Sequence, residues 1–307
     1  GLGIMGYPMA RKLLRAGHSV ALWSNTLEKA KKLASEESNA SVHSTPRDAV
    51  ANADFVFLCV GDTAMSERVI LGENGVVEGL KPGAIVADAS TISPTVSQAM
   101  AKKVAENGAS FLDAPCTGSK PGAEKATLTF MVGGKREVFE KTKPVFEAMG
   151  KQLYYCGDQG MGLHAKLSQN LLVGNIMQAL NESLVLAAKA GVDLELLVDI
   201  LNNSVAKGMI PFKAPFILRH DFSTNFSTRW MEKDLSLVLE SAGELSVPLP
   251  ITSVTQQIFR ATIAKGMGED DLCGSIRVLE DLANVSVRKD SPNPPHPAPD
   301  ALPEIIY

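Results

Sequence analysis

The stretch Gly160-Met-Gly-Leu-His-Ala-Lys166-Leu-Ser-Gln-Asn170 places a lysine and an asparagine four residues apart. On a helix this spacing puts both side chains on one face, and a run without helix breakers follows from Leu171 to about Ala190. Hydride transfer to a carbonyl leaves negative charge on oxygen, which an ammonium group stabilises or protonates. We therefore expect Lys166 to act as general acid or base, with Asn170 hydrogen-bonded either to the substrate oxygen or to Lys166. The plainer alternatives are a lysine stem lying along an amphipathic helix and an interhelical asparagine.

The chain opens with Gly1-Leu-Gly3-Ile-Met-Gly6, a GxGxxG pattern. In dinucleotide-binding folds this pattern is the turn from a strand into a helix, whose N-terminus attracts a pyrophosphate. Nothing precedes Gly1 in this sequence, so we expect the strand that leads into the motif to lie in residues absent from it. A glycine-rich turn without a ligand is the alternative. The candidate cofactor-binding residues here are Gly1, Leu2, Gly3, Ile4, Met5 and Gly6.

The next predicted strand, residues 19–23, leads into Ser24-Asn25-Thr26. An acidic residue at this place would bind the ribose 2′-hydroxyl of NAD, whereas polar or cationic residues suit the 2′-phosphate of NADP. Three short polar residues and the nearby Lys29 favour NADP, and NAD stays open because no arginine is present. Thr26 alone is also a candidate N-cap for the following helix.

Apolar runs alternate with helical segments through the first half of the chain. We predict strands at 54–60, 83–88, 111–113 and 128–132, with helices at 46–51, 63–71, 93–107 and 136–149. This alternation predicts a doubly wound α/β sheet of the Rossmann type over residues 1–159. Ligands of such sheets bind beyond the carboxyl ends of the strands. Three stretches fall there: Val60–Thr63, Ala89–Ile92 and Ala114–Ser119.

The second half of the chain is helical after Cys156, with proline and glycine at its breaks. We predict helices at 171–190, 194–203, 233–246, 254–265 and 275–287, with breaks that include Pro211 and Pro215. Residues 160–289 are therefore expected to form an all-helical substrate and oligomerisation domain, joined to the first by a long interdomain helix. Residues 290–307 contain six prolines and are expected to form a tail that packs no core.

Composition limits the function classes. The 307 residues are 45% hydrophobic and carry a net charge of −4 without a basic run, which argues against a nucleic-acid or membrane-surface role. Four widely spaced cysteines indicate a reducing, cytoplasmic compartment and no metal site, with an organellar location left open. Polar residues interrupt the apolar segment 171–201, so a buried helix is expected there rather than a membrane span.

Four blocks of this sequence resemble the β-hydroxyacid dehydrogenase family, and the resemblance covers roughly residues 1–282. They are the opening glycine motif with Pro8-Met-Ala10, Asp113-Ala-Pro-Cys-Thr-Gly-Ser119, Gly160-Met-Gly162 with Lys166 and Asn170, and Lys233-Asp234-Leu235. The resemblance implies a nicotinamide cofactor, a small hydroxyacid or aldehyde-acid substrate, and assembly as a homodimer or homotetramer.

The resemblance also implies roles for individual residues. Thr117, Gly118 and Ser119 would bind the substrate carboxylate, and Thr91 would contact both cofactor and substrate. Val60 would contact the cofactor. The remaining candidates come from the second half: Phe226 as a pocket wall, Lys233 beside cofactor and substrate, and Asp234 as an orienting partner. Ordinary alternatives are a plain turn, a core phenylalanine and a solvated charge pair.

Segments 204–213 and 221–226 are most similar to the glyoxylate/succinic semialdehyde reductase branch, which uses NADPH. Two departures stand out. Asn25 occupies the place of that branch's arginine, which weakens the NADP inference, and Cys116-Thr117 replaces the usual Val-Ser. Thr117 keeps the hydroxyl, whereas Cys116 adds a thiol that is either sensitive to oxidation or simply a small buried apolar group.

The expected function is therefore NADP(H)-dependent reduction of a short aldehyde acid, glyoxylate or succinic semialdehyde, with Lys166 as proton donor. An NAD-dependent 3-hydroxyisobutyrate-type dehydrogenase is the nearest alternative. An imine reductase or a non-catalytic cofactor-binding scaffold would be expected to lack Lys166. Lys213 and Arg229 are candidates to meet a second substrate carboxylate.

Overall fold

The computed structural model describes residues 1–204, 207–208 and 210–288. It divides into two compact units. Unit 1 comprises Gly1–Gln169 with Glu240–Ser246, and unit 2 comprises Asn170–Leu239 with the described part of Val247–Tyr307. The predicted fold class, a Rossmann-type domain followed by a helical one, is confirmed. The predicted boundary at 159/160 stays a prediction, and the proline-rich tail lies outside the described residues.

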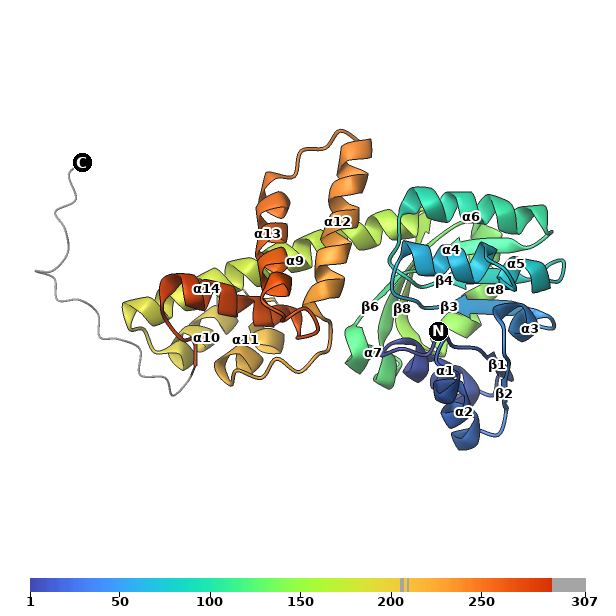
Figure 1. Ribbon diagram of the computed structural model, residues 1–307, viewed down its shortest axis with the longest axis horizontal. Helices are drawn as coiled ribbons and strands as arrows, with labels where there is room; N and C mark the ends of the chain where they lie inside the picture. The colour runs from blue at the N-terminus through green and yellow to red at the C-terminus, as the bar shows by residue number, and fades with distance from the viewer. Residues whose placement is uncertain (205–206, 209, 289–307) are drawn as a thin grey trace, which may run out of the picture. The chain divides into compact units, whose positions relative to one another are not determined.

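Unit 1 is built on two sheets (Figure 1). β1 (Val20–Leu22) and β2 (Ala40–Val42) form a parallel pair. The larger sheet has the order β3-β4-β5-β7-β6, with β8 paired to β7. Its strands are β3 (Phe55–Leu58), β4 (Ile85–Asp88), β5 (Ser110–Asp113), β6 (Cys116–Thr117), β7 (Leu128–Gly133) and β8 (Gly150–Gly157).

The strands that matter for a ligand are β3, β4 and β5, which are parallel neighbours. Leu58 pairs with Asp88, and Asp88 pairs with Asp113, so the three strands end level with one another. The loops that follow them therefore lie along one edge of the sheet, as the sequence predicted. β7 runs antiparallel to β5 and parallel to β8, so the sheet is mixed.

A groove of about 810 Å³ separates the two sheets of unit 1. It is lined by all of β1 and β3, with Gly1 and Leu2 among its other lining residues. Within the described residues, β1 pairs with β2 and β3 pairs with β4. The expectation that a strand leads into Gly1 stays a prediction.

Helices cover the sheets of unit 1, and several begin at a side-chain cap. The carboxylate of Asp62 accepts from Met65 N at 2.8 Å at the start of α4, and Thr45 caps α3 in the same way. On α1, Met9, Leu13 and Leu14 form the buried stripe. The helices are α1 (Gly6–Arg15), α2 (Leu27–Glu36), α3 (Pro46–Val50), α4 (Thr63–Leu71), α5 (Val76–Gly79), α6 (Pro94–Glu106), α7 (Ser119–Lys125) and α8 (Arg136–Glu147).

The second half of the chain is helical, and its longest helix is α9 (Met161–Ala190) (Figure 1). In unit 2, Met177 and Leu184 of this helix are fully buried with Leu235 and Phe259 in one apolar core. The other helices are α10 (Leu194–Asn202), α11 (Ile210–Leu218), α12 (Thr228–Glu244), α13 (Pro250–Ala264), the 3₁₀ turn η1 (Leu272–Ser275) and α14 (Ile276–Ala283).

The predicted breaks at Pro211 and Pro215 were wrong, because both residues lie in α11. Pro211 sits in the first turn, where its missing N–H has no helical acceptor to lose. Pro215 lies inside the helix, where burial of Ala214, Ile217 and Leu218 in the unit 2 core offsets the lost hydrogen bond.

By length and composition alone, α9 is the one described helix long and apolar enough to cross a membrane. Half of its most apolar window is buried inside the protein. Its side chains Met177, Leu180 and Leu184 belong to the unit 2 core. This packing is typical of an interior helix.

Candidate active site

The glycine motif forms the turn into α1, and its three glycines do different things. A Cβ added to Gly1 would lie 2.8 Å from the Cys59 carbonyl oxygen, and one added to Gly6 would collide with the carbonyl of Gly1. A Cβ on Gly3 would meet no atom within 4 Å. Gly1 and Gly6 are thus required for backbone packing, whereas Gly3 leaves open space at the N-terminus of α1. A pyrophosphate fits this arrangement, because it needs backbone N–H groups without a side chain in front of them.

The polar stretch beyond β1 lies at the start of α2. Ser24 is buried, Asn25 and Thr26 are exposed, and Thr26 occupies the N-cap position. Its side chain makes no capping hydrogen bond. Thr26 is therefore the N-cap residue of α2, as the structural alternative expected, but its hydroxyl is not used by the helix.

The loops beyond β3 and β4 are joined by hydrogen bonds. Val60 N donates to Ser90 Oγ at 2.9 Å, and Ser93 N donates to Thr63 Oγ1 at 3.1 Å. Ser90 is held in turn by Asp88, whose carboxylate accepts from Ser90 N at 2.9 Å. Thr91 is half-buried within this connected edge. These loops are thus rigidly placed at the end of the sheet where the sequence predicted ligand contacts.

Lys166 is buried in unit 1, one turn into α9. Its Nζ donates to Gln169 Oε1 at 3.0 Å. Its positive charge also lowers the pKa of the Cys116 thiol, so the ammonium group lies within electrostatic range of β6, the strand that leads into the substrate loop. Gln169 is a polar neighbour that the sequence reasoning did not select, although its spacing of three from Lys166 was a usable signal.

The predicted substrate loop turns sharply between β6 and α7. Gly118 has φ of 125°, and Ser119, the first residue of α7, has φ of 52°. Such left-handed conformations in succession are typical of short loops that present backbone N–H groups. Burial, with the neighbouring Cys59, raises the pKa of the Cys116 thiol to about 12, which outweighs the opposite effect of Lys166. A thiol held protonated is unreactive, which favours the structural role for Cys116.

The start of α9 is fixed by Asp113, a residue that the sequence analysis placed in a motif but gave no role. Its carboxylate, at the end of β5, accepts from Gly160 N at 2.7 Å, from Leu163 N at 2.9 Å and from Gln159 Nε2 at 2.8 Å. Burial raises the pKa of Asp113 to about 6, against these donors, which favour the ionised form.

Three of the predicted site residues come together in unit 2. Asn170 Nδ2 donates to Asp234 Oδ2, and Lys233 Nζ lies 2.6 Å from Asp234 Oδ1. Asn170 and Asp234 are both buried. The amide of Asn170 is therefore oriented by Asp234, the orienting role that the sequence suggested for this carboxylate. Lys233 also lies 5.9 Å from the Trp230 ring centroid.

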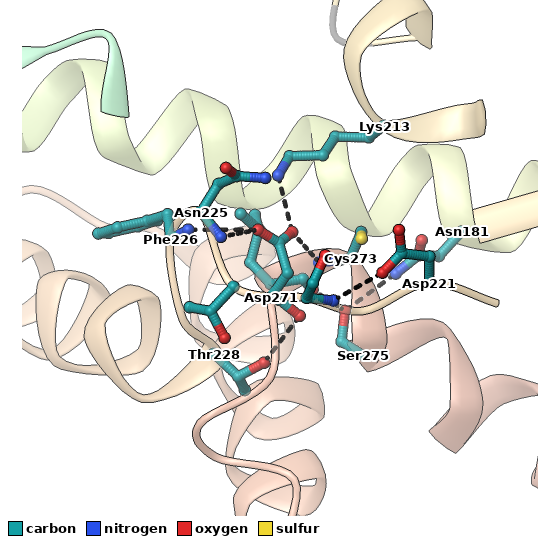
Figure 2. Close-up of polar contacts among 12 residues, drawn as sticks. Asn181, Lys213, Asp221, Asn225, Phe226, Thr228, Asp271, Cys273 and Ser275 are labelled. Carbon is teal, nitrogen blue, oxygen red and sulfur yellow. Dashed lines mark hydrogen bonds and ion pairs between the residues drawn. The ribbon is translucent and has the colours of Figure 1, made fainter. Parts of the chain in front are cut away.

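Lys213 and Arg229 have protein partners instead of open surroundings. Figure 2 shows Lys213 directed at Asp271, with Nζ 2.7 Å from Oδ1. Asp271 also accepts from Asn225 N at 3.0 Å, Phe226 N at 3.2 Å and Cys273 N at 3.2 Å. The side chain of Phe226 packs against the unit 2 core.

Arg229 Nε pairs with Glu269 at 2.7 Å on the surface. The two cations suggested for a second substrate carboxylate thus already face carboxylates of the protein. Of the branch segment 204–213, residues 205, 206 and 209 lie outside the described residues. Among the described residues, no three His, Cys, Asp or Glu side chains gather in a group that could hold a metal ion.

Comparison with known proteins agrees with this architecture. Residues 1–157 match the family described as the NAD binding domain of 6-phosphogluconate dehydrogenase, and residues 160–279 match that described as NAD-binding of NADP-dependent 3-hydroxyisobutyrate dehydrogenase. The chain is 38% identical to 2-(hydroxymethyl)glutarate dehydrogenase of Eubacterium barkeri, covering 94% of this chain and 95% of that protein.

A plant relative and a solved structure extend the comparison. The chain is 31% identical to the chloroplastic glyoxylate/succinic semialdehyde reductase 2 of Arabidopsis thaliana, covering 91% of this chain and 78% of that protein. The structure of 3-hydroxyisobutyrate dehydrogenase from Mycobacterium tuberculosis with L-serine superposes with a TM-score of 0.82 at 29% identity, covering 91% and 97% of the two chains.

The two matched regions define the class as a nicotinamide-dinucleotide-dependent oxidoreductase. The chain belongs to the β-hydroxyacid dehydrogenase family. The resemblance expected from the four sequence blocks is thereby confirmed, and so is the expectation of a nicotinamide cofactor and a small-molecule substrate.

Proposed function

We propose that this chain is an NADP(H)-dependent reductase of a short aldehyde acid, with Lys166 as the proton donor. The cofactor, when bound, supplies the hydride that reduces the aldehyde carbon. Lys166 Nζ stabilises the negative charge on the aldehyde oxygen and delivers the proton that completes the hydroxyacid; in the reverse direction it accepts this proton. The observation that carries the proposal is the burial of an ammonium group in the first turns of α9, within electrostatic range of Cys116 beside the substrate loop.

The other predicted residues divide the remaining work. The hydroxyls of Thr117 and Ser119 and the backbone N–H groups of Thr117, Gly118 and Ser119 bind the substrate carboxylate. Asn170, oriented by Asp234, offers its amide to the substrate one helical turn beyond Lys166.

The preference for NADP rests on the start of α2. Ser24, Asn25 and Thr26 offer short polar groups there, and the hydroxyl of Thr26 is not used for capping. One of the matching family descriptions also refers to an NADP-dependent enzyme. Fluorescence titration with NADPH and NADH tests this proposal. Tighter binding of NADPH, reduced in a Thr26→Val variant, is expected, and equal affinities would contradict it.

The substrate class is proposed from the relatives. Their names refer to glyoxylate, succinic semialdehyde, 2-hydroxy-3-oxopropionate and 3-hydroxyisobutyrate, all short acids with an aldehyde or hydroxyl group. A second candidate, an NAD-dependent 3-hydroxyisobutyrate-type dehydrogenase, is favoured by the lack of an arginine at Asn25. Initial rates with each cofactor against a panel of these four acids separate the two. A scaffold without catalysis predicts no turnover with any of them.

Self-association is also proposed. Within unit 2, α9, α10 and α13 each expose large apolar side chains: Leu172 and Ile176, Leu196 and Ile200, and Ile251 and Val254. Exposed large apolar side chains on three helices are a feature of proteins that self-associate, and they support the proposal of a homo-oligomer. Sedimentation velocity on the wild type and on an Ile251→Lys/Val254→Lys variant tests this proposal, with a smaller species expected for the variant.

A further inference from the structure

We propose that Asp113 is a positioning residue for catalysis, because its one carboxylate fixes the helix that carries Lys166 to the strand that leads into the substrate loop. The inference rests on the proposed role of Lys166. All of its contacts lie within unit 1.

The first part of the argument is the shape of the hydrogen-bond set. Oδ1 of Asp113 accepts from Gly160 N and Gln159 Nε2, and Oδ2 accepts from Leu163 N. The N–H groups at the start of a helix have no partner within the helix. The donors therefore span the residue before α9 and its third residue, so the carboxylate sets both the position and the direction of the first turn. Lys166 follows Leu163 by three residues.

The second part is the strand side of the same residue. Asp113 is the last residue of β5, and it pairs with Asp88 of β4 in the parallel register. Ala114 N donates to Asp88 O at 2.8 Å, so the chain stays anchored as it enters the substrate loop. A shift of the Asp113 side chain relative to the sheet would therefore move α9 and leave the loop in place.

The third part is the close approach of helix and sheet, which glycines allow. A Cβ added to Gly162 would lie 2.8 Å from the Asp113 carbonyl oxygen, and one added to Gly133 would lie 2.6 Å from Asp113 Oδ1. Since both distances are far below van der Waals contact, no side chain fits at either position, and α9 begins close against the sheet. Gly162 of the sequence block Gly160-Met-Gly162 thus serves this approach.

Replacing Asp113→Asn tests the inference. The asparagine keeps the volume but turns one acceptor into an N–H donor facing backbone N–H groups, so α9 is expected to shift. A displacement of about 1 Å at a reacting group can cost about 100-fold in rate. We expect kcat per cofactor-binding site, counted by NADPH fluorescence titration, to fall about 10- to 100-fold with glyoxylate or succinic semialdehyde. The dissociation constant for NADPH should stay near the wild-type value.

The matched control is Asp193→Ala. Asp193 caps α10 by accepting from Glu195 N and Leu196 N, so its loss removes an aspartate cap from a helix without Lys166. Its kcat per site should equal that of the wild type. If Asp113→Asn does not fold, Gly162→Ala tests the same displacement, because it leaves the carboxylate intact and forces the helix from the sheet.

The inference would be overturned if Asp113→Asn, or Gly162→Ala in its place, had the same kcat per site as the control Asp193→Ala. Asp113 would then be an ordinary structural residue. Lys166→Ala, measured in parallel, separates the two proposals. If Lys166→Ala is inactive and the Asp113 variant behaves like the control, only the positioning role fails. If Lys166→Ala keeps wild-type turnover, the proposed function itself fails.

Discussion

Asp113 in unit 1 and Asp271 in unit 2 are both almost fully buried, and each accepts hydrogen bonds from backbone N–H groups. They differ in one partner. Asp271 faces the ammonium group of Lys213, whereas the donors to Asp113 are two backbone N–H groups and an amide. Burial favours the protonated form of both, but Lys213 and the N–H donors outweigh burial and lower the pKa of Asp271. For Asp113 burial prevails, and its pKa rises to about 6.

The difference shows what a counter-ion changes. Asp271 joins α11, the loop at Asn225 and η1 in a fixed ionic centre (Figure 2). Asp113 instead holds the start of α9 with a carboxylate whose pKa lies close to neutrality. A paired buried carboxylate serves the fold, and one without a charged donor is suited to a functional site.

Breaking the paired carboxylate should have the largest effect on stability. Asp271→Ala leaves the half-buried Lys213 without its counter-charge and removes the acceptor of three backbone N–H groups, which should lower the free energy of unfolding by about 3–5 kcal/mol. Urea denaturation measures this loss. The double variant Asp271→Asn/Lys213→Met should recover part of it, and a double variant no more stable than Asp271→Ala would contradict the ionic account.

Asp113, the carboxylate without a charged donor, should make the stability of the protein depend on pH. The folded pKa of Asp113, about 6, lies above its ordinary value of 3.8. The folded state therefore binds the proton more tightly, and stability falls as the pH rises from about 4 to about 6. The contribution is on the order of 3 kcal/mol.

Urea denaturation of the wild type and Asp113→Asn at pH 4.5 and pH 7 measures the part of this contribution that is lost between these pH values, about 2 kcal/mol. It is the difference between the two proteins in how much their free energy of unfolding changes. In the variant, the free energy of unfolding should not fall between pH 4.5 and pH 7. Asp113 also acts on Cys156 of β8, whose pKa is raised by burial and further by this carboxylate. Cys156→Ser is the control, and its free energy of unfolding should fall between pH 4.5 and pH 7 by as much as that of the wild type. If the stability of the wild type and of Asp113→Asn changed equally with pH, Asp113 would not have the raised pKa that distinguishes it from Asp271.

An ordinary exposed cap should show the smallest effect. Asp193→Ala should lower the free energy of unfolding by about 1 kcal/mol, because it removes the acceptor for two N–H groups at a solvent-exposed helix start. Thermal denaturation measures it. A loss as large as that of Asp271→Ala would mean that capping alone explains the effects assigned to burial and charge.

The parts of the fold that depend on local pattern could be predicted from the sequence. The continuous apolar runs at β3 and β4 and the glycine turn into α1 are examples. β8 was not predicted, because its first residues, Lys151 and Gln152, are polar and exposed. The helix α11 was missed because its two prolines are normally helix breakers, and tertiary packing outweighs them.

In the candidate site, too, the features set by a local sequence pattern could be predicted, and those set by distant contacts could not. Lys166 and Asn170 were selected by their spacing on one helix. The partners of Asp113 lie 47 and 50 residues away, and Lys213 lies 58 residues from Asp271. No local pattern carries such pairings, so the role of Asp113 and the ion pair of Lys213 became visible only in three dimensions.

The central claim is that Lys166 supplies the proton in reduction of an aldehyde acid. Single-turnover oxidation of bound NADPH by glyoxylate or succinic semialdehyde, in wild type and Lys166→Ala, tests it most directly. We expect the rate to fall about 1,000-fold in the variant, with NADPH affinity unchanged. A variant that oxidises NADPH at the wild-type rate would contradict the claim.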